Sequence, residues 1–146
     1  ASQIYYGDET ARDLTIEGTV GDATLRSFMN WEELDSLKQT QDILAHWQKL
    51  GKFRRAHPAV GAGRHKRLSS KPYVFSRTYQ NDSFRDKVVI GLDLPEGKKN
   101  IRVKGFFGDG TTLRDTYSDT ELVVKNGQVE LDTPYDTALL EAVPSE

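Results

Sequence analysis

The sequence contains no cysteine among its 146 residues. This excludes disulfide bridges and thiolate metal sites, and it leaves the cellular compartment open. No apolar run approaches the roughly 18 residues that a membrane-spanning helix needs. No basic segment followed by an apolar stretch resembles a secretory signal, although a processed chain would lack one as well. Both bacterial export, to the periplasm or cell surface, and a cytoplasmic location therefore stay open.

The composition is that of a folded chain. Hydrophobic residues make up 36%, charged residues 29% and aromatic residues 10% of the sequence. This balance is typical of a globular protein with one modest core, and it argues against disorder. The length fits one ordinary domain, or a small domain with an appended piece.

The net charge of −2 conceals a strong segregation of charge along the chain. Residues 1–42 hold nine acidic and three basic residues, whereas residues 43–77 hold nine basic residues and no acidic one. Residues 78–146 hold thirteen acidic and eight basic residues. These blocks predict at least two structural units with a basic segment between them.

The N-terminal part predicts a strand, a long loop and a helix. Ile4–Tyr6 is β-branched and aromatic and runs into a Gly-Asp turn, which indicates a strand. Residues 10–30 are polar and contain glycine, as in a loop. A helix then follows Thr40, a fair N-cap, and ends before Pro58, because a residue preceding proline is disfavoured in the α region.

From Pro72 onward the pattern changes to short strands and turns. Apolar and polar residues alternate from Tyr73, which places Tyr73, Phe75 and Tyr79 on one face, and we assign that face to the core. Asn126-Gly127 is the strongest hairpin signal in the chain. Five to seven short strands at regular spacing predict an antiparallel β-sandwich.

Several of these segments resemble a known family. The opening "QIYYGDET" resembles the last strand of the catalytic barrel in the α-amylase family, family 13 of the glycoside hydrolases. "RSFMNW" matches a family pattern of Arg, Met and Trp through Arg26, Met29 and Trp31. The helix and its exit, "ILAHWQKLGKFRRAHPAVGAG", resemble the final barrel helix, and "VELDTPYDTALLEA" resembles the last two strands of the C-terminal domain.

The resemblance implies a mainly β fold, with an antiparallel Greek-key β-sandwich preceded by a remnant strand, loop and helix of a (β/α)8 barrel. Residues 1–60 would be that remnant, residues 61–71 a linker around two glycines, and residues 72–146 the all-β C-terminal domain. We expect residues 1–38 to be poorly held, because the neighbouring barrel strands are not in this chain.

The resemblance also implies a function. The parent enzyme would hydrolyse α-glucans such as starch and maltooligosaccharides with retention, through a carboxylate nucleophile and a carboxylic acid on earlier barrel strands. This chain would contribute no catalytic residue, and its sandwich would stabilise the barrel. Because substrate sites lie at the C-terminal face of such barrels, Asp8, Asp22 and Arg26 are candidates for an outer sugar-binding subsite.

The residues themselves indicate no separate chemistry. Asp8 and Glu9 are neighbours at a predicted strand end, so they would point apart rather than flank one bond. His46, His57 and His65 are spaced by 11 and 8 residues, unlike the i, i+4 spacing of a helical zinc site. Charge complementation at the helix end accounts for His57. We predict no metal and no cofactor.

Two other functions stay as alternatives. A glucan-binding accessory module would use sandwich aromatics, with Tyr73, Tyr79, Phe106, Phe107 and Tyr117 as candidates. A nucleic-acid-binding module would use the basic segment 49–71, but aromatic residues do not interleave with its charges. The leading interpretation predicts two partners, the barrel of the same polypeptide and, in the parent enzyme, an α-glucan. It predicts no nucleic acid partner, no membrane span and a monomeric state.

Overall fold

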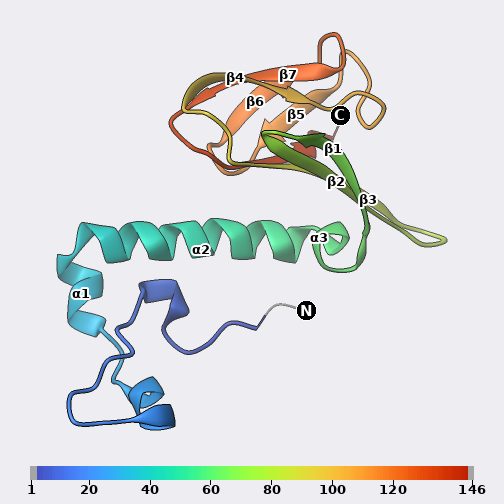
Figure 1. Cartoon of the computed structure of the whole chain (residues 1–146). Coiled ribbons are helices and arrows are strands. Elements are labelled where there is room, and N and C mark those ends of the chain that lie inside the picture. Colours follow the sequence, from blue (N-terminus) through green and yellow to red (C-terminus); the bar gives the residue numbers. More distant parts are fainter. Residues whose placement is uncertain (1–2, 145–146) are drawn as a thin grey trace. The chain divides into compact units, whose positions relative to one another are not determined.

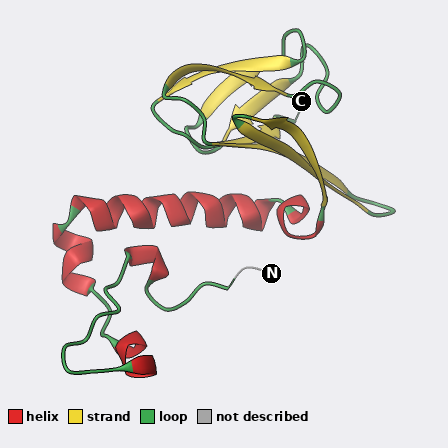
Figure 2. Cartoon of the chain, viewed as in Figure 1, coloured by secondary structure: helices red, strands yellow, loops and turns green. Residues whose placement is uncertain are grey.

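The computed structural model describes residues 3–144, which form two compact units divided between Gly51 and Lys52. The first unit runs up to Gly51 and the second begins at Lys52. Figure 1 shows the order of the elements along the chain. Figure 2 shows that every strand of the described chain belongs to the second unit. No helix within residues 3–144 is both long and apolar enough to cross a membrane.

The first unit contains short helical turns joined by loops. These are the 3-10 helices η1 (Asp8–Thr10) and η2 (Gly21–Arg26) and the helix α1 (Trp31–Ser36). The predicted strand at Ile4–Tyr6 is wrong, because this segment lies outside any sheet and its side chains are exposed. A strand needs a neighbour to satisfy its backbone groups, and the first unit supplies none within its described residues.

The predicted long helix is confirmed, with a shifted start. Helix α2 spans Lys38–Ala56 and so crosses the division between the units. Thr40 lies inside the helix and is buried, so it is not the N-cap that the sequence predicted. An ion pair between Lys38 and Asp42 joins the first turn to the next one. The helix ends two residues before Pro58, as expected from the steric effect of proline.

The second unit is a two-sheet antiparallel sandwich, which confirms the predicted fold class. The larger sheet has the order β1-β2-β3-β8-β5-β6, and β4 pairs with β7 in the smaller one. The strands are β1 (Arg64–Ser70), β2 (Tyr73–Gln80), β3 (Arg85–Leu92), β4 (Gly97–Arg102), β5 (Thr112–Asp115), β6 (Thr120–Val123), β7 (Gln128–Thr133) and β8 (Ala138–Ala142). Strand β8 is the last in the sequence but lies between β3 and β5 in the larger sheet. The C-terminal strand is therefore a central strand of that sheet.

The segment expected to be a linker, residues 61–71, instead holds a strand. Helix α3 (Pro58–Ala62) leads directly into β1, which pairs with β2 from Arg64↔Thr78 to Ser70↔Tyr73. β1 is an edge strand whose charged residues are exposed, so it lacks the alternation that marks a half-buried strand. Charged side chains on an edge strand also discourage pairing with another chain.

Two apolar layers stabilise the second unit. The first lies between the sheets and is formed by Val74, Val89, Leu94, Ile101, Val103, Phe107, Leu113, Leu122, Val124, Val129, Leu131, Ala138 and Leu140. The second lies on the other face of the larger sheet, where α3 packs against β2 and β3. Buried Val88, Ile90 and Leu139 belong to that face, since Ile90 pairs with Leu139 across β3 and β8.

The assignment of Tyr73, Phe75 and Tyr79 to the core is wrong. Val74 and Ser76 are the buried residues of β2, and the three aromatic side chains lie half-buried on the opposite, outer face. The period of two shows correctly which residues share a face. It does not show which face points into the core, because a sheet with protein packed against both faces carries aromatic residues on each of them.

Candidate functional site

The predicted sugar-contacting loop begins with Asp8, which closes a tight turn. Gly7 precedes it at φ 88°, in the left-handed region that favours glycine. A side-chain oxygen of Asp8 accepts a hydrogen bond of 2.7 Å from the backbone N–H of Tyr5. Asp8 then starts the short helix η1 and is itself exposed. Its carboxylate therefore both holds the turn and faces solvent.

Arg12 organises this loop. Its side chain is 6% exposed, and its Nε donates to the carbonyl of Tyr6 at 3.0 Å. Its terminal nitrogens donate to the carbonyls of Ser27 at 2.8 Å and Leu25 at 3.3 Å. The guanidinium also lies 4.8 Å from the centre of the Tyr6 ring. Arg12 thus joins the segment before η1 to the end of η2 and to the residue that follows it.

A second link runs from Thr10 to the start of α1. The Thr10 hydroxyl lies 2.7 Å from the side-chain oxygen of Asn30, and Asn30 returns a bond of 2.9 Å to the carbonyl of Thr10. Asn30 also donates to Glu33 at 2.5 Å. Sequence patterns missed both Arg12 and Thr10, because polar residues in a loop carry no signal of burial. The one available signal is Gly7, where an added Cβ would lie 2.5 Å from Arg12 Nε.

The predicted site residues Asp8, Asp22 and Arg26 are all exposed. Asp22 lies in the first turn of η2 and Arg26 is its last residue. No hydrogen bond or ion pair joins the three residues to one another within the described chain. Their role in sugar binding stays a prediction.

The first unit exposes an unusual amount of apolar surface. Every buried hydrophobic residue of the described chain belongs to the second unit, from Phe53 onward. Phe28 is 95% and Trp31 is 66% exposed. The exposed large apolar residues of the first unit are Ile4, Tyr5, Tyr6, Leu14, Val20, Leu25, Phe28, Trp31 and Leu37. Such a surface is typical of a segment that packs against further protein.

In the second unit, His57 joins two carboxylates. Its Nδ1 lies 2.8 Å from Asp86 Oδ1 and its Nε2 lies 2.7 Å from Glu141 Oε2. Each ring nitrogen therefore lies within hydrogen-bond distance of a carboxylate oxygen. The other oxygen of Asp86 accepts from the backbone N–H of Ala59 at 2.8 Å, and Arg77 donates to the carbonyl of Ala59 at 3.0 Å. These bonds hold α3 on the outer face of the sheet.

This arrangement corrects the sequence interpretation of His57 and argues against a catalytic role. The ring follows α2 and precedes α3, and its partners are strand carboxylates rather than the end of a helix. A general base needs a free nitrogen within reach of a substrate proton. Both nitrogens of His57 are already occupied, so the cluster is suited to fixing α3. Within residues 3–144, no group of three or more His, Asp or Glu side chains is arranged so that it could hold a metal ion.

The aromatic side chains of the sandwich separate into two sets. Phe107 and Tyr117 are buried, so neither offers a ring to a sugar. Tyr73 and Phe75 lie on the outer face, where the His65 ring of β1 stacks on Phe75 at 4.7 Å and the Tyr73 hydroxyl meets His65 Nε2 at 3.1 Å. Cross-strand pairing therefore places aromatic rings beside the basic strand β1, an arrangement that the linear sequence conceals.

Burial shifts the pKa of two titratable side chains of the sandwich, Lys87 and Tyr117. Burial, together with the positive charge of Arg85, lowers the pKa of Lys87, whose ammonium donates to the carbonyl of Phe106 at 3.1 Å. Burial raises the pKa of Tyr117, and the carboxylate of Asp136 adds to this effect. Each group occupies a packed position in the sandwich rather than a cleft. Neither shift indicates a catalytic acid or base.

No family model matches the chain. The chain is 40% identical over 83 residues to the periplasmic α-amylase of Escherichia coli K12, a match that covers 56% of this chain and 12% of that protein. An Anoxybacillus α-amylase has a similar fold, with a TM-score of 0.60 and 19% identity over 86% of this chain and 26% of its own. AmyP in complex with maltose matches with a TM-score of 0.59 and 17% identity over 81% of this chain and 24% of its own.

The two solved structures show a shared fold, and the sequence match adds a relationship to an α-amylase at 40% identity. In each comparison the chain spans less than a third of the other protein. These findings confirm the resemblance to α-amylases: this chain is similar to α-amylases of the glycoside hydrolase class over one part of their length.

Proposed function

We propose that this chain is the C-terminal part of an α-amylase-like glycoside hydrolase that acts on starch and maltooligosaccharides. The observation that carries the proposal is the 40% identity to a periplasmic α-amylase over 83 residues. In this proposal the chain holds none of the catalytic carboxylates, and its β-sandwich stabilises the catalytic barrel.

The exposed apolar surface of the first unit supports an origin within a larger fold. Residues 1–60 would belong to the barrel, where neighbouring strands and helices would cover Phe28, Trp31 and the segment Ile4–Tyr6. Each large apolar side chain that becomes fully buried contributes about 1.5–3 kcal/mol. The remaining residues would form the C-terminal domain, with β1 as part of the sandwich rather than of a linker.

The carboxylates of this chain do not suit retaining hydrolysis, which supports placing the catalytic pair elsewhere. Retention requires two carboxyl groups about 5–5.5 Å apart on either side of the glycosidic bond. Asp86 and Glu141 approach a common residue, but His57 lies between them and hydrogen-bonds to both. No sugar could enter between them without displacing that ring.

Within the same proposal, Asp8, Asp22 and Arg26 would line an outer sugar subsite of the complete enzyme. Their exposure leaves each side chain accessible to a ligand. Arg12 would act as a positioning residue, because its hydrogen bonds connect the segment before Asp8 with the segment that ends η2. The arginine itself is buried and would not touch the sugar.

Two measurements test the proposal. The purified chain should release no chromophore from 4-nitrophenyl maltoheptaoside and no reducing ends from starch, and reproducible turnover that co-purifies with it would contradict the proposal. The coding sequence upstream of Ala1 should encode further barrel strands bearing two carboxylates. An upstream sequence that encodes an unrelated protein, or a start codon at this point, would also contradict it.

A further inference from the structure

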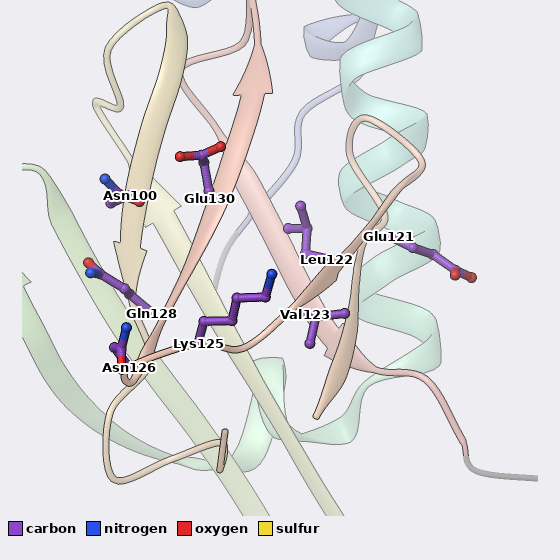
Figure 3. A pocket seen from close by; sticks show the side chains of 8 residues that line it. All are labelled: Asn100, Glu121, Leu122, Val123, Lys125, Asn126, Gln128 and Glu130. Carbon is purple, nitrogen blue, oxygen red and sulfur yellow. The ribbon is translucent and has the colours of Figure 1, made fainter. Parts of the chain in front are cut away.

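The sandwich carries an open groove between β6 and β7, which are neighbours in space but belong to different sheets. Its volume is about 450 Å³. Figure 3 shows Asn100 of β4 and Glu130 of β7 on one side, and Leu122 and Val123 of β6 on the other. The side chain of Lys125 extends into the space between them (Figure 3). The groove lies wholly within the second unit.

Three polar side chains of this groove have no hydrogen-bond partner within the described chain. They are the carboxamides of Asn100 and Gln128 and the ammonium of Lys125, all exposed. A carboxamide both donates and accepts, as a sugar hydroxyl does. Asn100 pairs with Glu130 and Arg102 pairs with Gln128 across β4 and β7, so both carboxamides project from the same face.

The groove also has an apolar side and a near-balanced charge. Val123 is 47% exposed and could contact the carbon–hydrogen face of a sugar ring. One carboxylate oxygen of Glu130 accepts from Lys98 at 2.9 Å, which offsets its charge. The lining contains Lys125 and Glu130, whereas Glu121 points away from them (Figure 3), so the groove favours neither an anion nor a cation. A neutral polyhydroxylated ligand fits this mixture better than a phosphate or a polyamine.

The walls of the groove are preorganised. Asn126 and Gly127 form a tight turn at φ 53° and φ 74°, and Lys125 and Gln128 exchange two backbone hydrogen bonds beside it. The carboxylate of Asp109 accepts from the N–H of Asn126 at 3.0 Å and of Gly127 at 2.7 Å. The backbone that carries Lys125 and Gln128 is therefore ordered before a ligand binds, so that mainly side-chain entropy is lost on binding.

We propose that this groove is an α-glucan-binding site on the sandwich. The polar and apolar lining identifies a neutral polyhydroxyl chain, and the choice of an α-glucan rests on the proposed function. The Asn100 and Gln128 carboxamides bond sugar hydroxyls, Lys125 donates to a further oxygen, and Val123 contacts a ring face.

The test is a titration of the isotope-labelled full chain with maltoheptaose, followed by two-dimensional NMR. Saturable shifts should appear at the side-chain amides of Asn100 and Gln128 and along β6 and β7, with a Kd near the millimolar range, as expected for a few neutral hydrogen bonds. Asn100→Ala and Gln128→Ala should each weaken binding about fivefold. Gln48→Ala, which removes an exposed carboxamide from α2, should leave the Kd within about twofold.

Three results would overturn the inference. One is the absence of saturable shifts at roughly ten times the expected millimolar Kd. Another is a set of shifts confined to the first unit, and the third is equal binding of cellohexaose, a β-glucan. The substituted side chains are exposed, and the same spectra show whether each variant is folded. Missing shifts together with an upstream barrel sequence would reject the groove alone, whereas groove binding without an upstream barrel would reject the proposed function alone.

Discussion

The two units of this chain hold themselves together in different ways. Up to Gly51, the buried residues of the described chain are Gly7, Thr10, Arg12 and Thr40, and hydrogen bonds of Thr10 and Arg12 connect the loops. From Lys52 onward, apolar side chains fill one layer between two sheets and another beneath α3. The difference shows that one polypeptide can contain a segment with an apolar core beside a segment whose large apolar side chains stay exposed.

The energetics explain why hydrogen bonds alone do not make the first unit independent. A hydrogen bond contributes about 1 kcal/mol net, and ordering one residue of backbone costs about 1–2 kcal/mol. The bonds of Arg12, Thr10 and Asn30 therefore do not offset the ordering of the surrounding loops. Burial of apolar surface is the missing contribution, and the exposed side chains of the first unit are the groups that could supply it.

The largest expected effect is the difference between two leucine truncations, one in the core of the second unit and one on the surface of the first. Leu140 is fully buried in the sandwich, and Leu140→Ala should lower the free energy of unfolding of the second unit by about 2–5 kcal/mol. Leu25 is exposed, and Leu25→Ala should change that free energy by less than about 0.5 kcal/mol. Urea unfolding followed by far-UV circular dichroism measures both, and similar losses would remove the distinction between the units.

The next effect concerns the carboxylate that fixes α3. Asp86→Ala leaves the His57 ring and the N–H of Ala59 without their acceptor, and should cost about 3 kcal/mol. Asp82→Ala, at the exposed tip of the β2–β3 hairpin, should cost less than about 0.5 kcal/mol. Equal unfolding free energies for the two variants would mean that the His57 cluster adds nothing to the sandwich.

A backbone substitution should have an intermediate effect. Gly127 has φ 74°, and a Cβ added there would lie 2.7 Å from the Cβ of Lys104. Gly127→Ala should therefore cost about 1–3 kcal/mol, through strain and displacement of the neighbouring loop. Gly108→Ala meets no atom within 4 Å and serves as the matched control. A stable Gly127→Ala variant would contradict the role assigned to this turn.

Removal of the loop organiser should have a local effect. Arg12→Met breaks the hydrogen bonds to Tyr6, Leu25 and Ser27. Backbone chemical shifts of those residues should move to random-coil values, while the unfolding free energy of the second unit stays within about 0.5 kcal/mol. Arg26→Met, at an exposed position, should alter neither. A large loss of sandwich stability in the Arg12 variant would show that the units support each other.

The smallest effect appears at alkaline pH. Burial raises the pKa of Tyr117, so its neutral phenol favours the folded second unit. That contribution is present below the unfolded value of about 10 and is lost as pH rises from there through the folded value. Tyr117→Phe should flatten this part of the stability profile, whereas Tyr5→Phe in the first unit should not. Identical profiles for wild type and Tyr117→Phe would contradict the assignment.

Much of the fold follows from local sequence signals. The Asn126-Gly127 pair predicts the turn because both residues adopt positive φ there. Pro58 predicts the end of the long helix, and alternation predicts the strands of the sandwich. Strand β1 was missed because its exposed charges hide it, and a strand at Ile4–Tyr6 was predicted because β propensity says nothing about the presence of a neighbour.

The candidate sites were less predictable, because they depend on residues that the fold brings together. Asp86 and Glu141 reach His57 from strands that are far apart in the sequence but paired in the sheet, and Arg12 meets Ser27 across a loop. Burial of charge is equally invisible in the sequence. Lys99 is buried because its ammonium donates to the carbonyls of Thr133 and Tyr135, each at 2.7 Å.

Native-state hydrogen exchange of the full chain tests the central claim most directly, because it measures the opening free energy of each segment separately. We predict that amides of residues 4–36 exchange through local openings of much lower free energy, while amides of β3, β5 and β8 exchange only through unfolding of the second unit. Protection of Ile4–Tyr6 and Arg12 equal to that of the sandwich would contradict the claim that the first unit needs further protein to complete it.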